Sequence, residues 1–140
     1  MREGFAFSTR FKVRYAEIDG QKVVFNSRYL EYADVAVTDY WDWTGIGAAL
    51  GDAWWALEFH VRRAEVDFLK PFTYGDEIEA FVRTEAIGRT SWTQLIEMTL
   101  PTTGALHATV RLVNVHVDLA SHSPTPIPDA VRAYMATVAG

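Results

Sequence analysis

One segment, Ser27 to Thr44, constrains the fold more than any other part of the chain. When its residues are placed at about 100° intervals around a helix axis, polar side chains fall on one side and apolar ones on the other. Asn26 or Ser27 can cap the start, and Gly45 supplies the left-handed residue that commonly ends a helix. Only Val35 lies on the wrong side. A sheet must cover the apolar face, which is formed by Tyr29, Tyr32, Ala33, Ala36, Val37, Tyr40 and Trp43.

The rest of the chain has the period-two pattern of β-strands. One strand is expected over 7–15, before the helix, and four follow a loop that runs through Gly51. A phase change near Arg62-Arg63 predicts a β-bulge, and Pro128 opens a short C-terminal helix. Pro and Gly residues at hairpin spacing predict that the last three strands form an antiparallel meander. The four later strands are predicted at 56–69, 76–86, 91–100 and 106–119.

These elements predict an α+β fold in which a five-stranded antiparallel sheet wraps around a long central helix. The chain has 140 residues, the usual size of one compact domain, so we expect a single domain over residues 1–140. It contains 14% aromatic residues, which is more than a small core needs. The helix accounts for several of them, and we hypothesise that one of the Trp54-Trp55 pair lines the acyl pocket or the subunit interface. Trp92 is a further candidate for contact with substrate or a second subunit.

Composition excludes several classes of function. Thirteen Lys and Arg against eighteen Asp and Glu give a net charge of −5, which argues against nucleic acid as a partner. The chain has no cysteine, which excludes disulfides, thiolate nucleophiles and Cys-based zinc sites. The four histidines lack metal-ligand spacing, so no metal or other cofactor is expected. No apolar run approaches a membrane span and residues 1–5 lack a signal-peptide core, so we predict a cytoplasmic protein with no membrane partner.

Several segments together are similar to the 4-hydroxybenzoyl-CoA thioesterase family of hot-dog fold proteins. The specific part is VRYAEID at 13–19, followed by VVFN at 23–26, then Tyr29-Leu30 and Asp34. Landmarks in the same order continue through VDFLKP at 66–71, YGDEI at 74–78, GRTS at 88–91 and PIP at 126–128. The resemblance implies a hot-dog fold, an acyl-CoA substrate, and a homodimer or homotetramer with its sites at the subunit interface.

The same resemblance implies two catalytic groups. Asp19 matches the family's catalytic aspartate, and thioester hydrolysis needs a carboxylate that either attacks the carbonyl or deprotonates a water. An Asp before Gly is also a common turn former, but the surrounding motif favours the catalytic role. The backbone N–H of Asn26 matches the group that polarises the thioester carbonyl, at the positive end of the helix dipole. The neighbouring Phe25 is expected to contact substrate.

Other candidate contacts lie elsewhere in the chain. Asp34 is either a solvated charge or an auxiliary group of the site. Arg89, Thr90 and Ser91 match a region where relatives contact coenzyme A, although an exposed hairpin arginine is also commonplace. Lys22 departs from the family, which usually has Gly there; Gly20 could instead supply the flexible residue.

The leading hypothesis is therefore an acyl-CoA thioesterase that releases a free carboxylic acid and CoA. Two alternatives stay open: a hot-dog dehydratase or hydratase, disfavoured because no His lies in the Asp19 to Asp34 segment, and a non-catalytic acyl-thioester binding protein, suggested by Lys22. The sequence leaves open the acyl group, CoA against carrier protein, nucleophile against general base, and dimer against tetramer.

Overall fold

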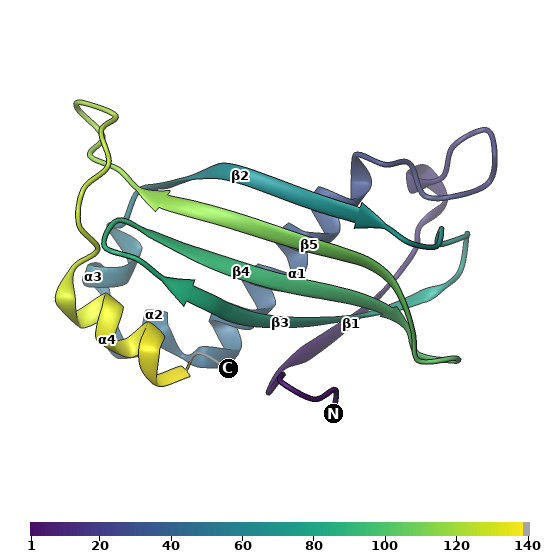
Figure 1. The fold of residues 1–140 in the computed structure, drawn as a ribbon, viewed down its shortest axis with the longest axis horizontal. Helices are drawn as coiled ribbons and strands as arrows, with labels where there is room; N and C mark the ends of the chain where they lie inside the picture. Colours follow the sequence, from purple (N-terminus) through teal and green to yellow (C-terminus); the bar gives the residue numbers. More distant parts are fainter. Residues whose placement is uncertain (139–140) are drawn as a thin grey trace.

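The computed structural model describes residues 1–138 and contains a five-stranded antiparallel sheet (Figure 1). The strand order is β1-β3-β4-β5-β2, so β1 and β2 form the two edges. The expected antiparallel sheet and the meander formed by β3, β4 and β5 are confirmed. The strands are β1 Ser8–Lys12, β2 Phe59–Phe68, β3 Glu77–Ile87, β4 Ser91–Leu100 and β5 Ala105–His116.

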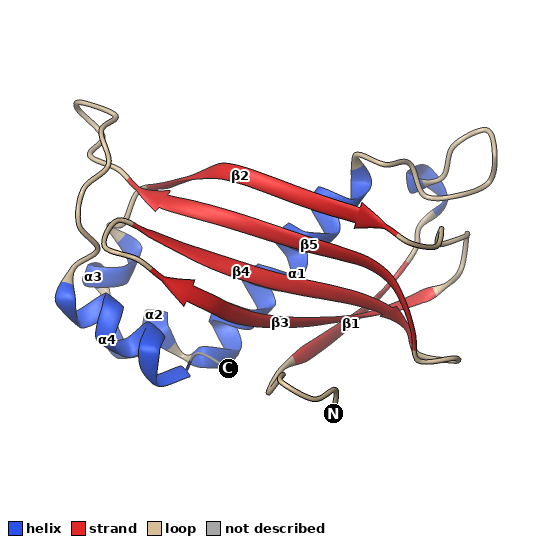
Figure 2. Ribbon diagram, viewed as in Figure 1, coloured by secondary structure: helices blue, strands red, loops and turns tan. Residues whose placement is uncertain are grey.

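Helix α1, Arg28–Thr44, crosses one face of the sheet, behind the strands in Figure 2. It begins after Ser27 and ends at Gly45, whose φ of 73° is the left-handed conformation expected there. One flank of α1 faces the β1 edge, because Thr9 Oγ1 donates to Asp39 at 2.7 Å. The residues that it buries are Tyr29, Tyr32, Ala33, Ala36, Tyr40, Trp41 and Thr44.

Two short helices replace the loop predicted after α1. They are α2, Ile46–Leu50, and α3, Asp52–Trp55, separated by Gly51 at φ 55°. Trp54 of α3 is buried with its ring centroid 5.1 Å from that of Trp41. The loop prediction was wrong because four- and five-residue helices are too short for their periodicity to be visible in the sequence.

The expected short C-terminal helix is confirmed as α4, Asp129–Val138. It buries Val131 and Met135, and the Tyr134 hydroxyl donates to Thr44 O at the end of α1 at 2.7 Å. Helices α2, α3 and α4 gather at one end of the sheet (Figure 1).

Strand β1 is shorter than predicted, because regular pairing stops at Lys12 and a 3₁₀ turn, η1 at Tyr15–Glu17, follows. Tyr15, the last residue of the predicted strand, is exposed. The predicted bulge in β2 is confirmed by a register shift between Val61 and Arg63.

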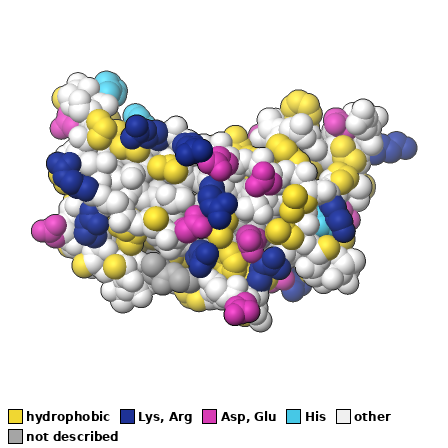
Figure 3. Space-filling model, viewed as in Figure 1, with side chains coloured by type: hydrophobic (Ala, Val, Ile, Leu, Met, Phe, Trp, Pro, Cys, Tyr) yellow, Lys and Arg dark blue, Asp and Glu magenta, His cyan; other side chains and the backbone are white. Residues whose placement is uncertain are grey.

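The sheet face opposite α1 carries interspersed acidic and basic side chains (Figure 3). They form ion pairs such as Arg111–Glu85 at 2.9 Å and Arg2–Glu97 at 2.6 Å. Opposite charges spread over one face are typical of a solvated surface, so the core lies between the sheet and the helices. None of the described helices is long and apolar enough to cross a membrane.

Candidate active site

The segment between β1 and α1 folds into a loop closed by its own backbone. Asp19 N–H donates to Val23 O at 2.8 Å, and Phe25 N–H donates to Glu17 O at 3.0 Å. Ile18 and Val24 form an antiparallel bridge between these two bonds. The loop therefore holds residues 19 and 25 at a defined separation at the start of α1.

The Asp19 side chain stands at the edge of a hollow of about 440 Å³ that opens beside the loop. Its Oδ1 accepts the Gln21 N–H at 2.7 Å, which is the turn-forming bond that an Asp before Gly commonly makes. Its second carboxylate oxygen accepts no hydrogen bond within residues 1–138. One oxygen therefore shapes the loop and the other is free for chemistry. The hollow is lined by Tyr15, Ile18, Asp19, Gly20, Lys22 and Tyr74.

Asn26 provides a free backbone donor. Its N–H meets no acceptor among the described residues, whereas the N–H of Phe25 is used in closing the loop. Ser27 is the N-cap of α1, and its side chain makes no capping hydrogen bond to residues 1–138. Asn26 lines a second hollow of about 150 Å³ together with the end of β2, so the two residues belong to one loop and line neighbouring stretches of its surface. The Phe25 side chain is exposed beside them.

Lys22 adopts φ 67°, the left-handed conformation that favours glycine. Gly20 does not take a positive φ, so the idea that it supplies the flexible residue was wrong. Lys22 itself makes the turn, and its N–H donates to Asp19 O at 3.0 Å. The loop therefore has a glycine-like backbone at position 22 without a glycine.

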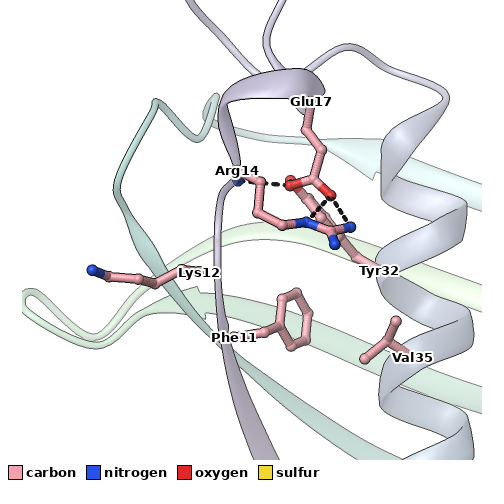
Figure 4. A pocket seen from close by; sticks show the side chains of 6 residues that line it. All are labelled: Phe11, Lys12, Arg14, Glu17, Tyr32 and Val35. Atoms are coloured by element: carbon pink, nitrogen blue, oxygen red, sulfur yellow. Dashed lines mark hydrogen bonds and ion pairs between the residues drawn. The ribbon is translucent and has the colours of Figure 1, made fainter.

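Glu17 is the buried carboxylate of the loop, with 3% of its surface exposed. It accepts hydrogen bonds from Arg14 N at 2.8 Å, Arg14 Nε at 3.0 Å, Arg14 Nη2 at 2.7 Å and Tyr32 Oη at 2.9 Å (Figure 4). Burial by itself raises the pKa of Glu17, but these donors outweigh it and the pKa falls below the ordinary value of 4.5. Burial and the adjacent Glu17 both raise the pKa of Tyr32, so its hydroxyl stays protonated and donates.

Glu17, Tyr32, Tyr15 and Tyr74 were missed as parts of the site. One signal for Glu17 was available: Arg14 and Glu17 are three residues apart and Glu17 is two residues before Asp19. The contact with Tyr32 could not be seen, because its partner lies 15 residues away across the loop.

The remaining predicted contacts lie apart from Asp19 within one subunit. Arg89, Thr90 and Ser91 form the hairpin between β3 and β4, at the opposite end of the sheet from the loop that follows β1 (Figure 1). Asp34 is exposed on the flank of α1 away from β1, the same flank as the exposed Leu30. Neither Asp34 nor the hairpin lines the Asp19 hollow.

The tryptophans also lie away from Asp19. Trp92, a candidate for contact with substrate or a second subunit, is 1% exposed and belongs to the core. Trp54 is buried, whereas Trp55 is exposed; both border a hollow beside α2 at the far end of α1. In the part of the chain that the structure describes, no three His, Asp or Glu side chains converge as a metal site.

Comparison with known proteins shows the family. The model of the thioesterase-like superfamily matches residues 13–135, which is most of the chain. The chain therefore belongs to this superfamily, and the predicted class of enzyme, a thioester hydrolase, is confirmed at the level of the family. Among curated proteins, none is significantly similar.

Several solved structures share the fold. A thioesterase from Thermus thermophilus, complexed with coenzyme A and zinc, is 31% identical, with a TM-score of 0.79 and coverage of 98% of this chain and 97% of that one. A 1,4-dihydroxy-2-naphthoyl-CoA thioesterase from Synechocystis is 18% identical, with a TM-score of 0.79 and coverage of 93% and 95%. A DHNA-CoA thioesterase from Staphylococcus aureus is 21% identical, with a TM-score of 0.79 and coverage of 93% and 89%.

The left-handed backbone at position 22 predicts the effect of Lys22→Gly. Glycine removes a strain of about 1–2 kcal/mol and adds an entropic cost of about 0.5–1 kcal/mol. The free energy of unfolding, measured in urea, is therefore expected to stay unchanged or rise by up to about 1.5 kcal/mol. Gln21→Gly is the matched control, because Gln21 has an ordinary φ and should lose about 0.5–1 kcal/mol. An equal loss in both variants would contradict the prediction.

The lowered pKa of Glu17 predicts a pH dependence of stability. Since the folded-state pKa lies below the unfolded value of about 4.5, ionised Glu17 stabilises the fold above that pH. This stabilisation is lost as the pH falls through the folded-state pKa. The difference in unfolding free energy between the wild type and Glu17→Gln should thus be constant from pH 7 to about 5 and shrink below about 4.5. Urea unfolding at each pH measures it, and a difference independent of pH would refute it.

Proposed function

We propose that this protein hydrolyses an acyl-CoA thioester to a free carboxylic acid and CoA, acting as one hot-dog domain over residues 1–140. One observation carries the proposal: a backbone N–H at Asn26 and a carboxylate oxygen at Asp19, neither with a partner among residues 1–138, come from the same closed loop. Membership of the thioesterase-like superfamily supports the reaction class. The coenzyme A bound to the similar Thermus thermophilus thioesterase supports CoA as the thiol.

The proposed chemistry follows from these two groups. The Asn26 N–H donates to the thioester carbonyl oxygen, where negative charge develops, and such a donor contributes roughly 3 kcal/mol to lowering the barrier. Asp19 either attacks the carbonyl carbon, forming a mixed anhydride that water then cleaves, or removes a proton from an attacking water. In both routes the C–S bond breaks and CoA leaves as a thiolate that takes up a proton.

The two alternative functions have less support. A dehydratase or hydratase would use a His with the carboxylate, and among residues 1–138 no His lines the Asp19 hollow. The binding-protein hypothesis was motivated by Lys22, and Lys22 keeps the glycine-like turn. The departure from the family pattern therefore does not argue against catalysis.

We further propose a homodimer in which two copies pair along β2. This edge strand runs for ten residues with almost every side chain exposed, and a long edge strand presents a row of unpaired backbone N–H and C=O groups that favours pairing with another strand. Two β2 strands would then continue one sheet across both subunits, and the exposed flank of α1 with Asp34 would face the partner. Each α1 would thereby become central to the assembly. The exposed apolar side chains at this edge are Phe59, Val61, Phe68 and Leu69.

Antiparallel pairing about a two-fold axis would also complete the site. It would bring the first residues of one β2 towards the last residues of the other, and hence towards the partner's Asn26 hollow. Ser91 and His60 both pair with Val115, so Ser91 is only two strands, about 10 Å, from the start of β2. Arg89, Thr90 and Ser91 of one subunit would thus contact the CoA bound at Asp19 of the other. A cytoplasmic location and the tetrameric alternative remain predictions from the sequence.

Substitution of the carboxylate tests the function. Asp19→Asn keeps the shape and the Oδ1 acceptor for Gln21 but removes the nucleophile or base, so hydrolysis is expected to fall by about 10²–10⁴-fold. Thiol release is measured over aromatic and aliphatic acyl-CoAs and acyl-carrier-protein thioesters. Asp118→Asn is the matched control, because Asp118 also accepts turn N–H bonds but lies in the loop after β5. Its activity should equal that of the wild type.

Two outcomes would overturn this assignment. Full activity in Asp19→Asn would exclude Asp19 as the reacting group, and a wild type silent on every thioester would overturn the function. Thermal stabilisation by acyl-CoA without turnover would then support the binding protein. Mass spectrometry after a rapid acid quench separates the two routes, because only direct attack leaves Asp19 acylated.

The β2 pairing predicts a specific effect of charge on assembly. Val61→Lys places like charges at the proposed interface and is expected to give monomers in sedimentation experiments, with loss of hydrolysis. Val35→Lys is the matched control, because Val35 is 45% exposed and Val61 is 57% exposed. This variant should stay dimeric, since Val35 faces the β1 side of the subunit. A dimeric Val61→Lys would contradict β2 pairing.

If sites are shared between subunits, a mixture of inactive Asp19→Asn and Arg89→Ala dimers should regain activity when subunits exchange.

A further inference from the structure

Glu17 is a buried charged group that the proposed reaction does not use. Its carboxylate lies against Arg14 and Tyr32 at a separate hollow of about 290 Å³ (Figure 4). It does not line the Asp19 hollow. A buried carboxylate destabilises a protein unless its hydrogen bonds are complete, so its presence requires an explanation. The four donors around it provide that completeness.

The donors to Glu17 come from two elements that the loop joins. Arg14 precedes the loop and supplies its backbone N–H and its guanidinium, whereas the Tyr32 hydroxyl comes from the second turn of α1. The backbone of Glu17 takes part as well, because its carbonyl accepts the Phe25 N–H. One residue therefore connects the end of β1, the loop with Asp19, the residue before Asn26, and the helix.

We propose that Glu17 is the positioning residue of the active site, which through Arg14 and Tyr32 holds the Asp19 carboxylate and the Asn26 N–H at the separation that catalysis needs. This inference rests on the proposed function. The Arg14 donors lie three residues from Glu17 in the same turn, whereas the Tyr32 donor reaches the carboxylate only when the loop is docked on α1, so a displaced loop leaves one acceptor of a buried charge without its partner. We call these hydrogen bonds of Glu17 with Arg14 and Tyr32 the clamp. The clamp disfavours displaced loops more strongly than an apolar contact would, because an apolar contact is non-directional and tolerates sliding.

Comparison of two Tyr→Phe substitutions on α1 tests the proposal. Tyr32→Phe removes one hydroxyl from the clamp, and Tyr40→Phe removes an equally buried hydroxyl, bonded to Thr84 at 3.1 Å, at the other end of the helix. Displacement of a reacting group by about 1 Å costs up to about 100-fold in rate. We expect kcat for thioester hydrolysis to fall by about 10- to 100-fold in Tyr32→Phe, with KM changed less than about threefold, and to stay at the wild-type level in Tyr40→Phe.

Amide hydrogen exchange provides a readout that does not need activity. The Asp19 and Phe25 amides close the loop, and their protection is expected to fall at least about tenfold in Tyr32→Phe and Glu17→Gln but not in Tyr40→Phe. Glu17→Gln keeps the size of the side chain and turns one acceptor into a donor that faces Arg14. Its kcat should therefore fall at least as far as that of Tyr32→Phe.

The outcomes separate the clamp from the function. Unchanged loop protection in Tyr32→Phe and Glu17→Gln would overturn the clamp, whatever the activity. Lost protection with unchanged kcat would overturn its role in catalysis. An equal fall of kcat in Tyr40→Phe would also overturn it, because general destabilisation would then explain both losses. A wild type without thioesterase activity would overturn the proposed function and the positioning role, while exchange would still report whether Glu17 fastens the loop.

Discussion

The packing of α1 against the sheet determines where every part of the site lies. The tyrosines on its buried face fill the space beneath the strands, and the first turn of the helix is thereby fixed at one end of the sheet. The Asp19 loop must meet that turn, since only the short segment from β1 to Arg28 connects the two elements. The hydrophobic core thus sets the coarse position of the loop, and polar contacts set its detail.

Those polar contacts are concentrated on one side of the loop. The Arg14 side chain is 77% exposed, whereas the side chain of its partner Glu17 is 4% exposed, so the ion pair has a solvent-exposed end and a buried end. Water screens the pair at its solvent-exposed end, and the lower dielectric constant strengthens the hydrogen bonds at its buried end. The Tyr32 hydroxyl lies at the buried end, so the link to α1 is shielded from water.

Most of the fold could be predicted from the sequence, because its long elements have clear periods. The two ends of α1, the meander and the bulge near Arg63 follow from local patterns that tertiary contacts do not override. The short helices α2 and α3 could not be predicted, since they are stabilised by packing against α1 and α4 rather than by a pattern of their own. For the candidate site, the Asp19 loop was recognisable as a motif. The contact between Glu17 and Tyr32, and the separation of Asp19 from Arg89, depend on how the chain folds back in space and could not be predicted.

The left-handed turn at Lys22 has a consequence for recognising related proteins. Backbone conformation constrains a position only through the atoms near the Cα, and a linear side chain such as lysine meets that constraint at a moderate energetic cost. Branching at the Cβ raises the cost sharply, so valine, isoleucine and threonine are excluded where lysine is accepted. A search pattern that demands glycine at this position would therefore reject functional sequences, and one that excludes only β-branched residues would retain them.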